Sequence, residues 1–315
     1  MSSTNSADAA RASTESGGGG TESGATPAAF EILRPKRQTI AVVLASPHSG
    51  RDYPPDFIAQ ARLDALSLRR SEDSFVDELF AGGPARGAPL LRALFPRAYV
   101  DPNREPYELD PEMFEDPLPA HANTESRRVR AGLGTIARVV ANGTPIYRRK
   151  LRFAEAEARI QGLYRPYHAA LAGLIRETLD GFGCAILLDC HSMPSIGGPM
   201  DADPGAARVD MVLGDRHGHA CDPVVTAVAA RVLGGQGYLV RHNAPYAGGY
   251  TTRHHGQPRL AVHALQIEIN RALYMDEERF ERSRGLGVVA SNMSSLVEAL
   301  GSIDPAVLAA PAAAE

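Results

Sequence analysis

The chain is poor in cysteine and has no excess charge of either sign, and both features narrow its class. Its 315 residues include only Cys184, Cys190 and Cys221, with no CxxC pair. These cysteines are too few for a disulfide framework, so we expect a reducing cytoplasm. The formal net charge of -4 offers no general attraction to nucleic acid or anionic membranes. No apolar run approaches the ~20 residues of a membrane-spanning helix. The sequence gives no prediction of the oligomeric state.

The sequence also lacks the short signatures of several enzyme classes. There is no GxxxxGK[ST] loop, no HExxH pair and no GxSxG turn, so nucleotide-binding and serine-hydrolase functions lose most of their support. Two GxGxxA matches, at residues 132–137 and 285–290, follow SRRVRA and RFERSR. A dinucleotide fingerprint follows a strand, so we interpret both matches as accidental.

Composition predicts one folded unit between two tails. Residues 1–28 are rich in Ser, Gly, Thr and Ala, and such a segment buries too little apolar surface to fold. It has neither the basic nor the apolar region of a secretory signal. Residues 29–302 contain no repeat and no linker, which indicates a single domain. Residues 303–315 are predicted to be a flexible C-terminal tail.

Strand-like and helix-like segments alternate along this domain. The runs TIAVVLASPHSG, AILLDCHSM, DMVLGD, YLVRHNAP and AVHALQIEINRALY predict strands, and another is expected near residues 98–100. Helical spacing is found in DALSLRRSEDSFVDELFA, in DPVVTAVAARVLGGQG, and in FAEAEARIQGLYRPYHAALAGLIRETLDGFG, where Pro166 predicts a bend. This alternation favours an α/β fold with three α/β/α layers around a mostly parallel mixed sheet, and ligands bind where such strands end.

Three of the predicted strands carry residues suited to chemistry at or near their ends. One run leads into His48, another reaches His191, and a third contains Glu268. Each alone has an ordinary explanation. His48 could cap a turn, and Asp189 and His191 could form a hydrogen-bonded pair in the core. Glu268 could form an ion pair with Arg271. Buried carboxylates and imidazoles are costly unless they are paired or bound to metal. Together the three favour a site for one divalent ion, Zn²⁺, at the sheet edge.

A zinc site of two imidazoles needs at least one carboxylate and an open position for water. The candidates are Glu72, Asp73 and Asp77 in the segment RSEDSFVDEL. We prefer Asp73, at the expected start of a helix near the exit of the first strand. Helical spacing places Asp77 on the same face, so the choice stays open. Asp189 is expected to orient a ligating imidazole.

Several longer stretches carry a resemblance to a known family. They include SPHSGRDYP, SEDSFVDELF, RAYVDPNR, EARIQGLYRPYHAAL, LLDCHSMP, VLGDRHGHACDP, NAPYAGGYTTRHHGQP and HALQIEINRALYM, in this order. The chain resembles the N-formylglutamate amidohydrolase family of histidine catabolism and, more distantly, the zinc carboxypeptidase and succinylglutamate desuccinylase group. The resemblance implies a zinc-carboxypeptidase-like fold and hydrolysis of the formamide of N-formyl-L-glutamate, a small anionic substrate.

The resemblance also implies roles for single residues. His48 and His191 match the histidine ligands, Asp73 matches the acidic position and Glu268 matches the catalytic carboxylate. Asn103 and Arg104 match a pair that holds a substrate carboxylate, with Arg271 and Arg130 as further candidates. The wider group has its acidic ligand three residues after the first histidine, where this chain has Arg51. This departure leaves the third ligand open. The spacing around the second acidic motif and in the middle of the chain is also shorter than in typical members, so a related N-acyl amino acid is an alternative substrate.

Two alternatives belong to other classes. Cys190 could serve as the nucleophile of an amidase, although its neighbour His191 should point to the opposite face of a strand. The chain could also be a non-catalytic ligand-binding protein on the same fold, since a fold does not prove chemistry. Glu268 speaks against the second alternative, because a passive binder needs no proton acceptor.

Overall fold

The computed structural model describes residues 28–199 and 201–309. The predicted N-terminal tail lies outside this part of the chain except for residue 28. Within the described residues the main sheet has seven strands, in the spatial order β1 (Phe30–Leu33), β3 (Leu90–Ala93), β2 (Val42–Ser46), β4 (Ala185–Met193), β7 (Val262–Asn270), β5 (Met211–Gly214) and β6 (Val240–His242). A separate hairpin pairs β8 (Met275–Asp276) with β9 (Glu281–Arg282).

The four central strands are parallel, and the strands beside them, β1 at one edge and β5 with its parallel neighbour β6 at the other, run the opposite way. β3, β2, β4 and β7 pair in parallel, whereas β1 is antiparallel to β3 and β5 is antiparallel to β7. This confirms the predicted mixed, mostly parallel sheet. The prediction of a strand near residues 98–100 was wrong. Tyr99 N donates to Pro96 O at 2.9 Å, so a turn forms there, and the strand of this region is β3, which precedes the proline.

Helices of very different length connect the strands. The α-helices are α1 (Pro55–Gln60), α2 (Ala65–Leu68), α3 (Val76–Leu79), α4 (Arg127–Arg130), α5 (Phe153–Arg159), α6 (Arg165–Phe182), α7 (Pro223–Gly235), α8 (Tyr250–His255), α9 (Leu286–Gly301) and α10 (Pro305–Leu308). Short 3-10 turns lie at Arg69–Ser71, Pro84–Arg86, Pro111–Met113, Pro258–Leu260 and Arg271–Leu273. A π-turn at Ile160–Tyr164 joins α5 to α6, so Pro166 lies at the start of α6 and does not interrupt it.

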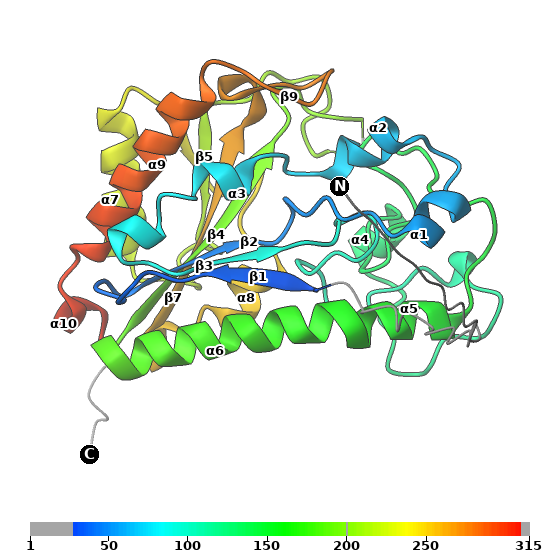
Figure 1. Ribbon diagram of the computed structural model, residues 1–315, viewed down its shortest axis with the longest axis horizontal. Helices are drawn as coiled ribbons and strands as arrows, with labels where there is room; N and C mark the ends of the chain where they lie inside the picture. The colour runs from blue at the N-terminus through cyan, green and yellow to red at the C-terminus, as the bar shows by residue number, and fades with distance from the viewer. Residues whose placement is uncertain (1–27, 200, 310–315) are drawn as a thin grey trace, which may run out of the picture.

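The helices cover both faces of the sheet, which confirms the three-layer prediction. α6 runs along one face, and α7 and α9 lie on the other (Figure 1). Alternate residues of β4 divide between the two cores: Ala185 and Leu187 pack with α6, while Ile186 and Leu188 pack with α7 and α9. The same alternation decides which face each polar residue at the end of β4 can reach.

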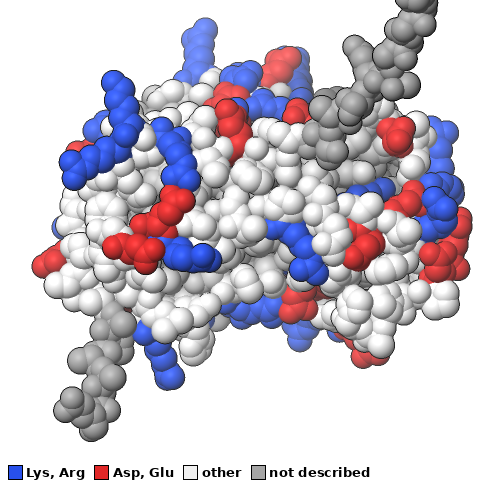
Figure 2. Space-filling view, turned by 60° about the horizontal axis from the view of Figure 1, so that its bottom comes forward, with Lys and Arg blue, Asp and Glu red and all other residues white. Residues whose placement is uncertain are grey.

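The folded body extends past the predicted boundary at residue 302. Leu308 of α10 is buried in the core with α7 and α9, and its carbonyl oxygen lies 2.9 Å from His263 Nε2. A short helix therefore replaces the first part of the expected C-terminal tail, and residues 310–315 lie outside the described range. The face in Figure 2 carries Lys and Arg interspersed with Asp and Glu. No described helix combines the length and the apolar character needed to cross a bilayer.

We expect Leu308→Ala to lower the free energy of unfolding by about 2–4 kcal/mol, because it leaves a cavity in the core. Val307→Ala is the matched control, since Val307 is 55% exposed in the same helix and its truncation should change stability little. Urea denaturation of both variants measures the difference. Equal, small effects would show that α10 does not pack in solution.

Candidate metal centre

Parallel pairing brings the polar residues of three strands to one edge of the sheet. In the register of β4 and β7, His191 lies opposite Glu268 and Asp189 lies opposite Gln266. Residues paired in this way project from the same face. His48 follows β2, which is the other neighbour of β4. The strand order thus brings residues that are far apart in the sequence close together at one edge of the sheet.

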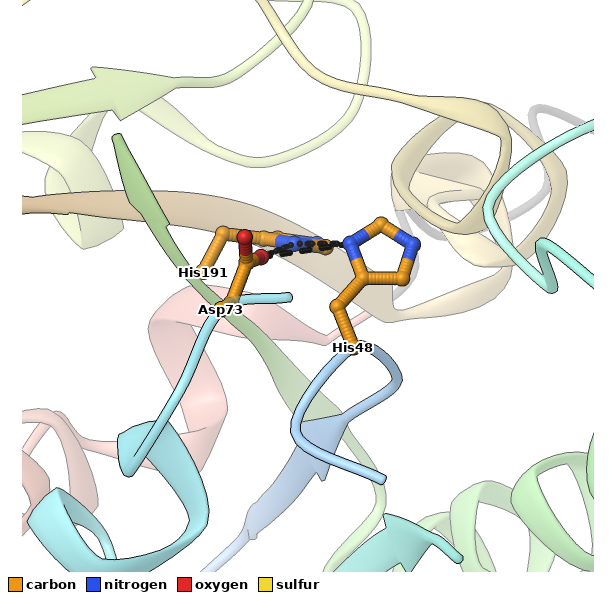
Figure 3. Close-up of side chains that lie close together, drawn as sticks. All are labelled: His48, Asp73 and His191. Carbon is orange, nitrogen blue, oxygen red and sulfur yellow. Dashed lines mark hydrogen bonds and ion pairs between the residues drawn. The ribbon is translucent and has the colours of Figure 1, made fainter. Parts of the chain in front are cut away.

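His48, Asp73 and His191 meet at one point (Figure 3). Asp73 Oδ2 lies 3.2 Å from His48 Nδ1 and 3.0 Å from His191 Nδ1, and the two Nδ1 atoms are 3.1 Å apart. All three side chains are buried. Ligand atoms of a tetrahedral zinc lie about 3.3–3.6 Å apart, as bond lengths of about 2.0–2.2 Å require. The three atoms are therefore close to the spacing of a zinc site.

Asp73 reaches this point from a loop, not from the helix expected around it. The helical pattern is divided into α2 and α3, and α3 begins only at Val76. The backbone N–H of Asp73 donates to His48 O at 3.0 Å, and Ser49 Oγ donates to Asp73 O at 3.1 Å. These two bonds fasten the loop to the segment that follows β2, so the carboxylate faces both imidazoles.

The two other candidate carboxylates are occupied elsewhere. Glu72 accepts hydrogen bonds from Tyr53 and Ser74, each at 2.7 Å. Asp77 pairs with Arg92 at 2.8 Å and also lies 3.3 Å from Arg51. The structure therefore brings Asp73, and neither Glu72 nor Asp77, to the histidines.

A carboxylate lies behind each imidazole. Asp101 Oδ1 is 2.7 Å from His48 Nε2, and Asp189 Oδ1 is 3.0 Å from His191 Nε2. At His48 this hydrogen bond favours the proton on Nε2, which leaves a lone pair on Nδ1, whereas at His191 the amide of Asn103 also approaches Nε2, at 3.2 Å. Two imidazole nitrogens and one carboxylate oxygen, all of them possible metal-ligand atoms, converge at this point. A cation satisfies all three, so the residues present fit a divalent metal.

The titration of the cluster agrees with a site for positive charge. Burial lowers the pKa of His191, but Asp189 and Asp73 outweigh burial and raise it well above the ordinary value. Burial raises the pKa of Asp73, and the close approach of His191 and His48 outweighs it and holds that pKa well below the usual range. Asp73 thus remains ionised beside His191, whose surroundings favour a positive charge.

Glu268 lies beside this cluster with a different protonation behaviour. Burial raises its pKa to about 7; the charge of His191 opposes the shift and that of Asp73 adds to it. Gln266 Nε2 donates to Glu268 Oε1 at 2.9 Å and orients the carboxyl group. A carboxyl with a pKa near neutrality can both accept and return a proton under physiological conditions.

These groups line a cavity of about 410 Å³. Three of the predicted substrate-binding residues, Asn103, Arg104 and Arg271, line it as well. Arg271 donates to Asp73 Oδ1 at 3.0 Å, so its ion pair is with Asp73 and not with Glu268. Arg130 is not among the lining residues: it is exposed and donates to Glu125 O. Its place is taken by Arg127 and Arg128 of the same helix.

Asn103 is held in place by helix α8. Its Oδ1 accepts from Thr251 N at 2.8 Å, and its Nδ2 lies 3.2 Å from His191 Nε2. Gly249 makes this approach possible, because a Cβ there would lie 2.3 Å from Asn103 Oδ1. Thr252 Oγ1 also donates to Asp189 at 3.3 Å. The segment before and within α8 therefore supports the ligand-orienting residues from behind.

Sequence reasoning missed a further set of supporting residues. Asp101 stands two residues before Asn103 in RAYVDPNR, and this spacing was the available signal. Tyr164 OH donates to Arg104 O at 2.7 Å, and His168 Nε2 lies 2.8 Å from Pro102 O. These two side chains, one helical turn apart, hold the loop that presents Asp101 and Asn103.

The arrangement of Cys190 does not suit a nucleophile. It packs in the core with α7 and α9, on the opposite face of β4 from His191. Burial raises the pKa of its thiol well above the ordinary value, which suppresses the reactive thiolate. The predicted alternation of β4 therefore separates this cysteine from the histidines and the cavity.

Two curated proteins that are similar in sequence to this chain are named N-formylglutamate deformylases. A family model described as N-formylglutamate amidohydrolase matches residues 40–275. The N-formylglutamate deformylase of Pseudomonas aeruginosa is 31% identical over 253 residues, which cover 79% of this chain and 87% of that protein. The deformylase of Pseudomonas putida is 26% identical over 254 residues, covering 78% and 86%.

A solved structure supports the same assignment. The N-formylglutamate amidohydrolase of Ralstonia eutropha JMP134 is 36% identical and superposes with a TM-score of 0.80, covering 89% of this chain and 99% of that one. A protein of Agrobacterium tumefaciens, 22% identical with a TM-score of 0.59, shares the fold. The family match spans both histidines, Asp73 and Glu268. The chain therefore belongs to the N-formylglutamate amidohydrolase family.

Proposed function

We propose that this protein hydrolyses the formamide bond of N-formyl-L-glutamate to formate and glutamate, with zinc held by His48, Asp73 and His191. The observation that carries the proposal is the convergence of their three ligand atoms within 3.0–3.2 Å of one another in a buried cavity that also contains Glu268. Deformylase relatives at 31% and 26% identity support the choice of reaction.

A zinc ion bound there supplies a Lewis acid that activates water near neutral pH and polarises a carbonyl oxygen. The chain supplies the proton transfers. Glu268 accepts the proton of the attacking water and later gives it to the departing amine, in keeping with a pKa of about 7. Asp101 keeps the imidazole of His48 in the tautomer that presents Nδ1, and Asp189 lies 3.0 Å behind His191. Arg271 is fixed by Ser192 and Asp73 beside the ligand atoms, where it can bind the substrate's α-carboxylate.

Replacing Asp73 should weaken metal binding more than replacing the nearby Asp77. Losing a residue that only orients a metal ligand typically lowers metal affinity by about 10- to 100-fold. We expect Asp73→Asn, which removes a ligand itself, to lower zinc affinity by more than this and to abolish activity. Asp77→Asn is the matched control and should retain zinc, since Asp77 is buried against Arg92. Metal analysis after dialysis, and zinc titration into apoprotein, measure both. Equal zinc loss in the two variants would reject Asp73 as a ligand.

Glu268→Gln should separate chemistry from metal binding. The amide fills the same volume but cannot take a proton, so we expect turnover to fall by about 10²- to 10⁴-fold. Zinc content should match the unmodified enzyme. Single-turnover measurements with N-formylglutamate test this. Turnover within a few fold of the unmodified enzyme would assign the base to another group, and no turnover in the unmodified zinc-loaded protein would favour a binding protein.

The pKa of Glu268 also predicts the pH dependence. The base is active when ionised, so kcat/KM should rise with pH until Glu268 has lost its proton. The midpoint should lie at or below the value of about 7, because the positive charge of a bound metal lowers the pKa of a nearby carboxyl. A pH profile of kcat/KM measures it. Activity that falls as the pH rises from 5 to 7 would contradict the assignment.

A further inference from the structure

The cavity carries more positive charge than the rest of the molecule suggests. Four carboxylates line it: Asp73, Asp101, Asp201 and Glu268. Six arginines line it: Arg70, Arg97, Arg104, Arg127, Arg128 and Arg271. The chain as a whole has a formal net charge of -4, and both signs are interspersed over the face in Figure 2. The excess of arginine is therefore a local property of this cavity, which concentrates anions there.

Three of the cavity arginines, Arg97, Arg104 and Arg271, already have hydrogen-bond partners within the protein. Arg97 donates to Asp101 Oδ2 at 2.7 Å, and Arg271 donates to Asp73. Arg104 donates through Nε to Leu133 O and through NH1 to Asn103 O, both at 2.9 Å. The nearest carboxylate oxygen to Arg104, of Asp101, is 3.6 Å from NH2. Arg104 is thus bound mainly by neutral carbonyls, which fix its position and leave its charge incompletely neutralised.

The three exposed arginines of the cavity, here called the arginines of the rim, have no acidic partner among the described residues. Arg70, Arg127 and Arg128 are exposed, and among the described residues none of the three makes an ion pair. Helix α4 presents Arg127 and Arg128 to the cavity, and Ser126 caps it by accepting from Val129 N at 3.0 Å. Arg130 of the same helix turns away toward Glu125 O. Helix α4 therefore contains two arginines that line the cavity and one, Arg130, that does not.

Arg128 lines the same cavity as Arg104, and its charge affects the pKa of Arg104. Burial lowers the pKa of Arg104, and the charge of Arg128 is the next largest cause of its fall to about 9. Two guanidinium groups that repel each other in this way are stabilised by an anion shared between them. A carboxylate is the matching group, since its two oxygens accept from planar guanidinium donors.

We propose that Arg128, together with Arg104, binds the side-chain carboxylate of the substrate, so that the enzyme selects N-formyl derivatives of acidic amino acids. The inference rests on the proposed deformylase activity. In N-formylglutamate the α-carboxylate is attached next to the scissile amide, near the metal ligands and Arg271. The side-chain carboxylate lies two methylene groups farther away. It therefore needs a cation that is distinct from Arg271 and not engaged by Asp73.

The test compares two substrates that differ only in this charge. We expect Arg128→Gln in the zinc-loaded enzyme to lower kcat/KM for N-formylglutamate by about 10-fold, because a charged hydrogen bond is lost. The value for N-formylglutamine should change less than about twofold. Arg128→Lys should restore part of the difference. Arg130→Gln is the matched control on the same helix and should leave both substrates unaffected.

Other outcomes overturn the proposal. An equal loss for both substrates in Arg128→Gln would indicate a general structural role, and no loss, or the same loss in Arg130→Gln, would place the carboxylate elsewhere. Equilibrium binding of L-glutamate and L-glutamine to the same variants separates this failure from that of the proposed function. Without turnover, a preference for glutamate that Arg128→Gln abolishes would still support the site. Absence of that preference in the unmodified protein would reject it.

Discussion

Three electron-pair donors converge in a buried space, and this convergence constrains the rest of the molecule. The ligand atoms of His48, Asp73 and His191 approach one another within 3.0–3.2 Å. Such an arrangement is unfavourable in a dry interior unless a cation occupies the centre. The surrounding structure holds the three groups against their mutual repulsion, and it does so through a second layer of contacts.

That second layer consists largely of short segments held by longer ones. Asp101 and Asn103 lie in an irregular loop, yet Tyr164 and His168 of the continuous π- and α-helical segment bind the carbonyl groups on both sides of Asn103. Helix α8 contributes Thr251 and Thr252 from the opposite direction. Rigid elements thus position the polar groups that orient the imidazoles, which is how a site keeps its geometry when its own residues come from loops.

The electrostatics of the cavity divide it into two functional parts. Around the ligand atoms, carboxylates and arginines are paired closely, and Glu268 has a pKa near neutrality because burial and Asp73 outweigh the cationic groups nearby. Away from them, Arg104 and the arginines of the rim have few acidic partners. The first part suits bond cleavage and the second suits recognition of a negatively charged group. The two parts meet in one cavity of about 410 Å³.

The sequence alone determined the fold class and the residues of the cluster, because hydrophobic periodicity and polar residues at strand ends are local patterns. It predicted a sheet of parallel strands between helices, and it placed His48, His191 and Glu268 at or near strand ends that the structure brings together. Asn103 was implied only by the resemblance to the family. It could not choose firmly between Asp73 and Asp77, because an extended helix would have placed both on one face. Only the tertiary structure made the choice: Asp73 lies in a loop before α3 and is hydrogen-bonded to His48 and Ser49. Likewise, only the packing of α4 decided that Arg128 and not Arg130 lines the cavity. Side-chain direction on a short helix depends on contacts with distant parts of the chain, and no local pattern records those contacts.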